Sequence, residues 1–334
     1  MNQGMAAVVL GVGLLLVPFL GVPDYYMHML ILILIWSLAY TAWSIMGRFG
    51  LVSLGHGAFM GIGAYAVALL WNHWGVTPWL GIPVALLLAA GAAVLIGYPC
   101  FRFRIVGHYF ALVTLALTEV VRLTIVAMRD YTGGSLGMTP RQDGQGVSWW
   151  ALQFADKDYF YVLALVCWAF GLWVWWKVDR SMARYAMEAI AENEDASAAV
   201  GVNVMAQKIR ITVISAVLTA LAGILYGQYQ MYINPETVSG IAVSLQIVFA
   251  VVAGGLYVLL GPTVGAVFTI LLAESLRVMI GTDMVGLDAT IYGFLLVLFI
   301  IFLPRGILGT ALAWAQGRPD RATTPLNATR AKQA

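Results

Sequence analysis

The chain has 334 residues, of which 61% are hydrophobic and only 10% are Asp, Glu, Lys or Arg, and its mean hydropathy is +0.87. A typical soluble domain carries about 25% charged residues, so this composition excludes an ordinary soluble globular protein, and the net charge of +2 indicates no particular partner. We therefore expect an all-α, polytopic bundle of helices in a lipid bilayer, with no nucleic-acid partner.

Apolar runs bounded by turn signals predict about ten membrane segments. Residues 1 to 23 carry no charged side chain, so the positive start of a secretory signal is missing and we expect the first segment to be an uncleaved helix. We expect residues 1–310 to form a transmembrane domain and the polar residues 311–334 to form a disordered cytoplasmic tail. The segments lie near residues 5–22, 26–46, 56–72, 79–99, 108–127, 159–176, 211–232, 241–259, 262–281 and 289–303.

The stretch from Gly47 to Tyr65 is the most glycine-dense part of the chain, with six Gly in 19 residues. Either the helix breaks near Gly47 to Gly57 and lines a pathway, or the small residues let neighbouring helices pack closely. A second break is expected near Gly261. Neither His56 nor His108 has companion ligands at metal spacing, so we expect no metal site. The candidate pathway residues in these stretches are Ser53, Gly55, His56, Gly57, Gly254 and Gly255.

Residues 111–122 align without gaps on residues 266–277 and share Ala, Thr, Leu, Glu and Arg in register. The match indicates either an internal repeat or a chance similarity between two apolar helices. Each copy carries Glu and Arg three residues apart, close enough to pair on one helix face. Because charges are costly in lipid, these pairs either line the permeation route or fix helix packing. Thr114, Glu119 and Glu274 therefore join the pathway candidates.

Residues 128–158 form the one long connection on the expected outer face, with the sequence TGGSLG at 132–137. Connections longer than about 15 residues in compact proteins are usually functional. This connection is therefore either a docking surface for a substrate-delivering partner or a flexible connector whose Trp149 and Trp150 lie at the membrane interface.

Ten of the 34 charged residues fall between Lys177 and Arg210. We expect this coupling segment, 177–210, to be one solvated excursion that forms two short helices. Residues 181–191 are rich in helix formers, and Asn193 can cap a second helix that Gly201 ends. Residues 195–201 (DASAAVG) resemble the EAAxxxG coupling-loop signature of ABC importer permeases, although a solvated hairpin without a partner is the alternative. The candidate ATPase-coupling residues are Arg184, Glu188, Glu194, Asp195, Ala196, Ser197 and Gly201.

Lys and Arg are distributed unevenly over the connections. With a cytoplasmic N-terminus, thirteen of them lie inside and three outside, which agrees with the positive-inside rule. Both termini and the coupling segment are therefore expected in the cytoplasm. The inner set is Arg48, Arg102, Arg104, Lys177, Arg180, Arg184, Lys208, Arg210, Arg305, Arg318, Arg321, Arg330 and Lys332, and the outer set is Arg129, Arg141 and Lys157.

The sequence gives little support for enzymatic chemistry. It contains no GxxxxGK[ST], no HExxH and no Cys pair at zinc spacing. Cys100 and Cys167 lie in or beside apolar segments, where we expect free thiols. We therefore predict a transport protein with no catalytic residues and no cofactor of its own, which cannot hydrolyse ATP through a P-loop.

Several stretches together resemble the LivM-type permeases of branched-chain amino acid ABC importers. The resemblance extends over residues 37–307 and departs at 254–261 (GGLYVLLG), where a further Gly and a small polar residue would be usual. The matching stretches are residues 53–65 (SLGHGAFMGIGAY), 107–117 (GHYFALVTLAL), 132–137 (TGGSLG), 196–202 (ASAAVGV) with Lys208, and 303–307 (LPRGI).

The resemblance implies a multi-pass subunit of the bacterial inner membrane. Its partners would be a homologous LivH-type permease, two cytoplasmic ABC ATPases that hold ATP and Mg, and a periplasmic substrate-binding protein. The substrate would be Leu, Ile, Val or a related amino acid, although similar permeases serve urea and other small solutes.

An ion-coupled secondary transporter is the alternative from another class, with Glu119 or Glu274 as the proton or sodium site. It needs no ATPase partner, so dependence of transport on ATP or on an ion gradient separates the two hypotheses. A membrane enzyme is a third alternative, and it lacks a recognisable nucleophile or metal set.

Overall fold

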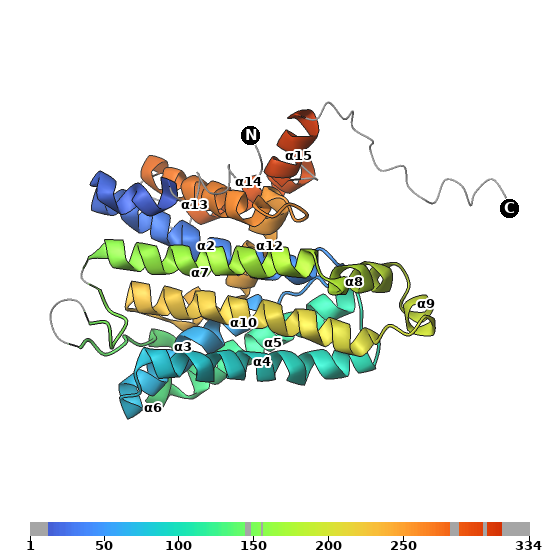
Figure 1. Cartoon of the computed structure of the whole chain (residues 1–334). Helices are drawn as coiled ribbons and strands as arrows, with labels where there is room; N and C mark the ends of the chain where they lie inside the picture. The colour runs from blue at the N-terminus through green and yellow to red at the C-terminus, as the bar shows by residue number, and fades with distance from the viewer. Residues whose placement is uncertain (1–12, 144–147, 155, 281–286, 303–305, 316–334) are drawn as a thin grey trace.

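The computed structural model describes residues 13–143, 148–154, 156–280, 287–302 and 306–315 (Figure 1). In these ranges the regular elements are helices, and the only extended pairings are two isolated bridges, Met138 with Ile233 and Ser148 with Gln153. The all-α prediction is confirmed. The elements are η1 (Val17–Leu20), α2 (Asp24–Gly47), α3 (His56–Trp74), α4 (Pro78–Arg102), α5 (His108–Ala127), α6 (Arg129–Thr132), η2 (Gly134–Leu136), α7 (Lys157–Asp179), α8 (Met182–Glu192), α9 (Glu194–Ala199), α10 (Val204–Gln230), α11 (Pro235–Ser239), α12 (Ile241–Gly254), α13 (Gly261–Ile280), α14 (Leu287–Phe302) and α15 (Gly306–Ala315).

Six described helices are long and apolar enough to cross a membrane: α2, α4, α5, α7, α10 and α13. The expected ten segments are therefore not confirmed. The 14 residues of α12 extend only about 21 Å at 1.5 Å per residue, short of the roughly 30 Å of a bilayer core. The expected first segment, 5–22, begins outside the described residues, and residues 303–305 and the tail from 316 also lie outside them.

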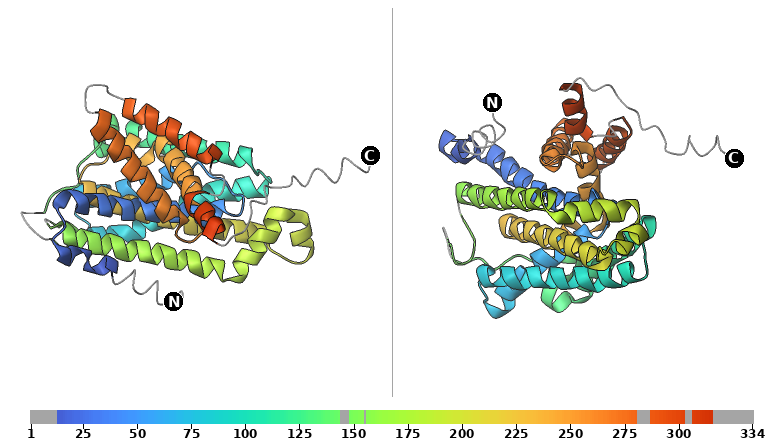
Figure 2. Two further views of the ribbon diagram at one scale, coloured as in Figure 1. Left: turned by 90° about the horizontal axis from the view of Figure 1, so that it is seen from above. Right: turned by 45° about the vertical axis from the view of Figure 1, so that its right-hand side comes forward.

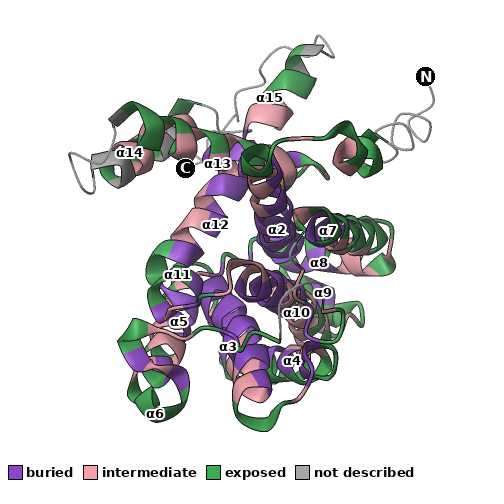
Figure 3. Cartoon of the chain, turned by 90° about the vertical axis from the view of Figure 1, so that its left-hand side faces the viewer, coloured by how far each residue is buried: buried purple, intermediate pink, exposed green. Residues whose placement is uncertain are grey.

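The core lies around α2. This helix is apolar on all sides, as expected of a helix surrounded by others, and 83% of its most apolar window is buried. It packs against α7, α10 and α13, while α3 packs against α4 and α10. Figure 3 shows buried residues concentrated on α2, α3 and α10. By contrast, only 22% of the corresponding window is buried in α5 and in α13.

The glycine-rich stretch shows both a helix break and close helix packing, in different parts of it, while the predicted pathway role of the break stays a prediction. The chain leaves the helix between the end of α2 and the start of α3, over residues 48–55. Further on, Gly63 lies against the backbone of Ala220, and Gly223 of α10 lies against the backbone of Met60. A Cβ atom on either glycine would overlap a carbonyl group, so these glycines set the close approach of α3 and α10.

The two ends of the bundle differ in character. The α8–α9 hairpin extends beyond one end, and the connection between η2 and α7 lies at the opposite end (Figures 1 and 2). This separation agrees with the predicted placement of the coupling segment and the outer connection on opposite sides of a membrane. The predicted repeat is not confirmed, although its two copies lie on helices of 20 residues each, α5 and α13. Cys100 and Cys167 are free thiols, as expected.

Candidate functional site

The broken segment comprises residues 48–57, from the end of α2 to the first turn of α3. Gly50 and Val52 in it are exposed, whereas Ser53 and residues 55–57 are buried, and hydrogen bonds hold the backbone of residues 53–57. The indole Nε1 of Trp43 donates to the carbonyl of Ser53 at 2.7 Å. The Ser53 hydroxyl accepts a bond from the amide of Gly55 at 3.1 Å. Unsatisfied backbone groups are costly at membrane depth, so an irregular segment needs such partners.

Hydroxyl groups on α5 and α12 form further hydrogen bonds to the backbone of the broken segment. Thr114 Oγ1 on α5 accepts from the amide of Leu54 at 2.9 Å, and Thr118 Oγ1 donates to the Leu54 carbonyl at 2.9 Å. Ser244 Oγ on α12 accepts from the amide of Gly57 at 2.9 Å. The segment is thus fixed by helices that lie far apart in the sequence.

His56 connects α3 to α10 from a fully buried position. Its Nε2 lies 2.8 Å from Ser215 Oγ, and Ser215 Oγ lies 2.6 Å from the carbonyl of Ala42. Since that carbonyl can only accept, the Ser215 proton points to it, and His56 Nε2 must be the donor toward Ser215. Over the described ranges, no group of three His, Cys, Asp or Glu residues could hold a metal ion.

The Glu119–Arg122 pair of α5 forms as predicted and extends to a residue that the sequence did not single out. Arg122 Nε lies 3.1 and 3.0 Å from the two carboxylate oxygens of Glu119. Arg122 Nη1 lies 2.6 Å from Oε1 of Glu236. The cluster therefore clamps α11 to α5. The geometry is that of a packing contact, and it leaves a pathway role untested.

The remaining pathway candidates lie elsewhere. Gly254 lies against Gly261 and Gly265, where α12 turns into α13, and Gly255 has a φ of +125°. Glu274 accepts a hydrogen bond from Tyr25 Oη at 2.7 Å. Tyr25 and Trp43 are 18 residues apart on α2, which corresponds to about 27 Å along the helix. Glu274, which contacts Tyr25, is therefore not close to the broken segment that Trp43 contacts.

The structure thus gathers five of the nine predicted pathway residues in one place, namely Ser53, Gly55, His56, Gly57 and Thr114. Four polar partners of this site were not predicted from the sequence. They carried one available signal, since each is a hydrogen-bonding side chain inside an apolar run. These partners are Trp43, Thr118, Ser215 and Ser244.

The α8–α9 hairpin confirms the predicted pair of short helices. The side chain of Asn193 caps α9 by accepting from the Ala196 amide at 2.9 Å, and Ser197 is buried and bonds back to the Asn193 carbonyl at 2.8 Å. The helix ends at Ala199, and Gly201 follows the C-cap residue Val200 with a φ of +93°, which favours glycine. Ala196 and its small neighbours Ala198 and Ala199 are exposed.

One set of ion pairs fixes the start of the hairpin to the bundle. Asp179, the last residue of α7, lies 2.9 Å from Arg48 and 3.3 Å from Arg184. Arg184 also lies 2.7 Å from Glu188, and this hydrogen bond raises the pKa of Arg184. The guanidinium of Arg48 lies 4.2 Å from the ring centroid of Trp175. Burial lowers the pKa of Arg48, and Asp179 opposes that effect.

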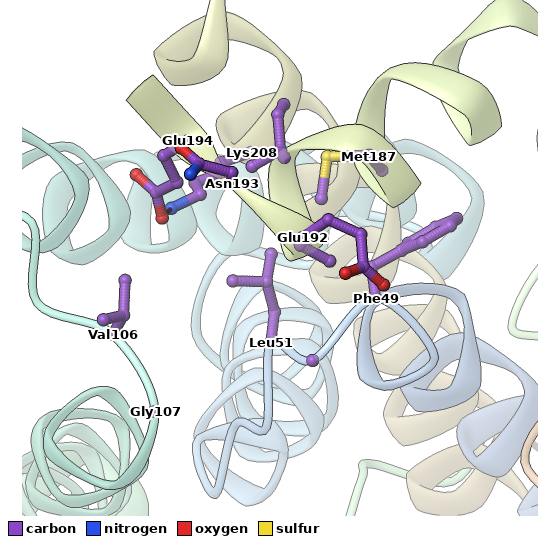
Figure 4. Close-up of a pocket in the computed structure, with 12 residues that line it drawn as sticks. Phe49, Leu51, Val106, Gly107, Met187, Glu192, Asn193, Glu194 and Lys208 are labelled. Atoms are coloured by element: carbon purple, nitrogen blue, oxygen red, sulfur yellow. Dashed lines mark hydrogen bonds and ion pairs between the residues drawn. The ribbon is translucent and has the colours of Figure 1, made fainter. Parts of the chain in front are cut away.

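A second set fixes α9. Glu194 pairs with Lys208 of α10, and Asp195 lies 3.0 Å from Arg104. Beneath the junction of α8 and α9 is a cavity of about 300 Å³, which Phe49 and Leu51 also line. Figure 4 shows Glu194 and Lys208 together at one side of this cavity. Four of the predicted coupling residues therefore make ion pairs within the chain, whereas contact with an ATPase stays a prediction.

Residues 22–303 match the model of a protein family described as the branched-chain amino acid transport system permease component. The chain belongs to this permease family. The LivM protein of Escherichia coli K12, named a high-affinity branched-chain amino acid transport system permease, is 31% identical over 287 residues, and LivM of Salmonella typhimurium LT2 is 30% identical. The match covers 79% of the chain and 65% of the length of each relative. No solved structure matches.

The match confirms the resemblance to LivM-type permeases seen in the sequence. Membership of this permease family favours a transport subunit over an ion-coupled transporter or a membrane enzyme. The matched region contains the broken segment, the α8–α9 hairpin and all six candidate membrane spans.

Proposed function

We propose that this chain is a permease subunit of an ABC importer that moves branched-chain or other hydrophobic amino acids across the bacterial inner membrane. Separate cytoplasmic ATPases bind ATP and Mg and supply the energy. A homologous permease of the LivH type completes the membrane unit, and a periplasmic protein delivers the substrate. The names of the two LivM relatives, which describe branched-chain amino acid transport, support this substrate class.

The observation that carries the proposal is the α8–α9 hairpin. It lies at one end of an apolar bundle, its charged side chains pair with the bundle, and its second helix exposes alanines. Small exposed side chains allow a helix to enter a cleft on another protein, while neighbouring charges fix its register. This surface fits a cytoplasmic ATPase.

In the proposed mechanism, ATP binding closes the ATPase dimer and displaces the hairpin. The hairpin transmits this displacement to the helices that hold the broken segment, and the bundle opens alternately to the two sides. The chain itself performs no ATP chemistry. Both termini and the hairpin lie in the cytoplasm, and residues 128–158 face the periplasm.

Reconstitution of the complete complex in proteoliposomes tests the proposal. We expect uptake of radiolabelled leucine that requires ATP and the binding protein and that persists when proton and sodium gradients are collapsed. We also expect deletion of residues 181–201 to abolish ATPase association. Uptake that follows an ion gradient while ATP is kept high, or full transport by the deletion variant, would overturn the proposal. Inhibition of leucine uptake by an excess of urea or small amides would assign a different solute to the permease.

A further inference from the structure

In the described part of the chain, three hairpin residues, Arg184, Glu194 and Asp195, pair directly with residues of the bundle, and the partner of Glu194 is the most buried of the three. The side chain of Lys208 is only 3% exposed and that of Glu194 is 29% exposed. In the neighbouring pair, Arg104 and Asp195 are 71% and 74% exposed. Solvent screens an exposed pair, whereas a buried charge depends strongly on its partner. Glu194 is therefore the hairpin residue that is bound directly to a buried cation.

Lys208 is also held by its other surroundings. Its ammonium lies 5.5 Å from the ring centroid of Phe101, at the end of α4. Lys208 thus lies in the bundle, although its ammonium pairs with a carboxylate of the hairpin. If the hairpin moved without Lys208, a buried ammonium would lose its carboxylate, which is strongly unfavourable.

Lys208 begins a line of buried polar residues on one face of α10. Thr212, Ser215 and Thr219 follow it at intervals of four, three and four residues, the spacing of a single helix face. Ser215 lies seven residues from Lys208, about 10 Å along the helix. It is the residue that bonds to His56 at the start of α3. A rigid helix therefore connects the hairpin to the broken segment.

The cavity beneath the hairpin leaves part of its interface with the bundle unfilled. Glu192, Met187 and the connections at residues 49–51 and 106–107 line it. Close packing transmits displacement, and here it is limited to the buried side chains of α8, Met187 and Ile190. A push on α9 itself would reach the bundle through the ion pairs of α9.

We propose that Lys208 is a positioning residue that couples α9, through Glu194, to α10 and so to the broken segment at His56. The proposal rests on the ABC-importer function proposed above. Lys208 touches neither solute nor nucleotide. Its role is to keep α9 and α10 moving as one body, so that each ATPase cycle changes the structure around the broken segment.

The test measures how much radiolabelled leucine the reconstituted complex imports for each ATP hydrolysed. We expect Lys208→Met to lower this ratio about tenfold while the complex still assembles and hydrolyses ATP. Glu194→Gln should have a similar effect. The exchange of both charges in Glu194→Lys with Lys208→Glu should restore most of the ratio, because an ion pair is formed again.

Arg102→Met is the matched control. Arg102 is an exposed basic residue at the same end of the bundle, the last residue of α4 and outside the coupling segment, and we expect the variant to import as much leucine per ATP as the wild type. An unchanged ratio in Lys208→Met would overturn the role of Lys208. If Lys208→Met does not assemble, the exchanged double variant decides: restored assembly and ratio support the proposal, and failure to restore them overturns it. A wild-type complex without ATP-driven uptake would instead contradict the proposed function itself.

Discussion

At the scale of single residues, Gly63 controls the distance between α3 and α10. A Cβ atom on Gly63 would overlap the backbone of Ala220, which cannot move aside like a flexible side chain. We expect Gly63→Ala to lower the free energy of unfolding by about 2 kcal/mol, the usual cost of overpacking a core. Thermal unfolding of the purified protein in detergent measures this loss.

Gly91 on α4 provides the control for that substitution. No atom lies within 4 Å of a Cβ built on Gly91, and the residue is exposed. Gly91→Ala should leave stability unchanged or raise it by about 1 kcal/mol, because Ala is the better helix former. Equal losses for the two variants would contradict the close approach of α3 and α10.

Ser244 shows how one hydroxyl group supports the broken segment. Removing it in Ser244→Ala leaves the buried amide of Gly57 without its acceptor. We expect a loss of about 2 kcal/mol, since an unsatisfied buried donor typically costs 1–3 kcal/mol, together with faster hydrogen exchange at residues 53–57. Hydrogen exchange measured by mass spectrometry shows whether exchange becomes faster and whether the change is at residues 53–57.

Ser275 is the corresponding control for Ser244. It is exposed on α13 and, among the residues that the structure describes, donates to the carbonyl of Leu272 in its own helix. Ser275→Ala should change neither the stability nor the exchange rate at residues 53–57. Protection of Gly57 that survives in Ser244→Ala would show that another group accepts its amide.

At the scale of elements, α9 depends on its cap more than a long helix does. It has six residues, and Asn193 satisfies one of the few amides that need a partner. We expect Asn193→Ala to cost about 1 kcal/mol, to increase hydrogen exchange in α9 and to weaken co-purification with the ATPases. Pull-down under increasing salt would measure the last effect.

Asn203 caps α10 by the same contact, accepting from the Ala206 amide at 3.0 Å. Because α10 has 27 residues and packs along most of its length, Asn203→Ala should leave ATPase association intact. Parallel losses of association in both variants would mean that capping strength alone does not explain the role of α9.

The hairpin also shows which elements a sequence can predict. Asn193, Gly201 and the acidic first turn of α9 act within a few residues of one another, so local rules were sufficient. The break before α3 was also predictable, because six glycines in 19 residues weaken a helix wherever it lies. The structure confirms both local predictions, the hairpin and the helix break.

At the scale of the whole molecule, local rules were insufficient. The partners of the broken segment come from α2, α5, α10 and α12, and the clamp on Arg122 requires Glu236, which is 114 residues away. No spacing in the sequence indicates such contacts. The number of spans was not confirmed for a related reason, since apolar content predicts burial but does not fix helix length, and α12 is apolar although it has only 14 residues.

The orientation of the molecule is the remaining whole-chain prediction. The ion pairs place Arg48, Arg104 and Lys208 near the hairpin, so the positive-inside rule assigns that end to the cytoplasm. Val200 on the hairpin is 81% exposed and Leu136 in the opposite connection is 75% exposed. In a variant with both native cysteines replaced by Ala, Leu136→Cys should react with an impermeant maleimide on intact cells, and Val200→Cys should react only after permeabilisation. The reverse labelling pattern would show that the bundle has the opposite orientation. A cytoplasmic ATPase could not contact the hairpin in that orientation.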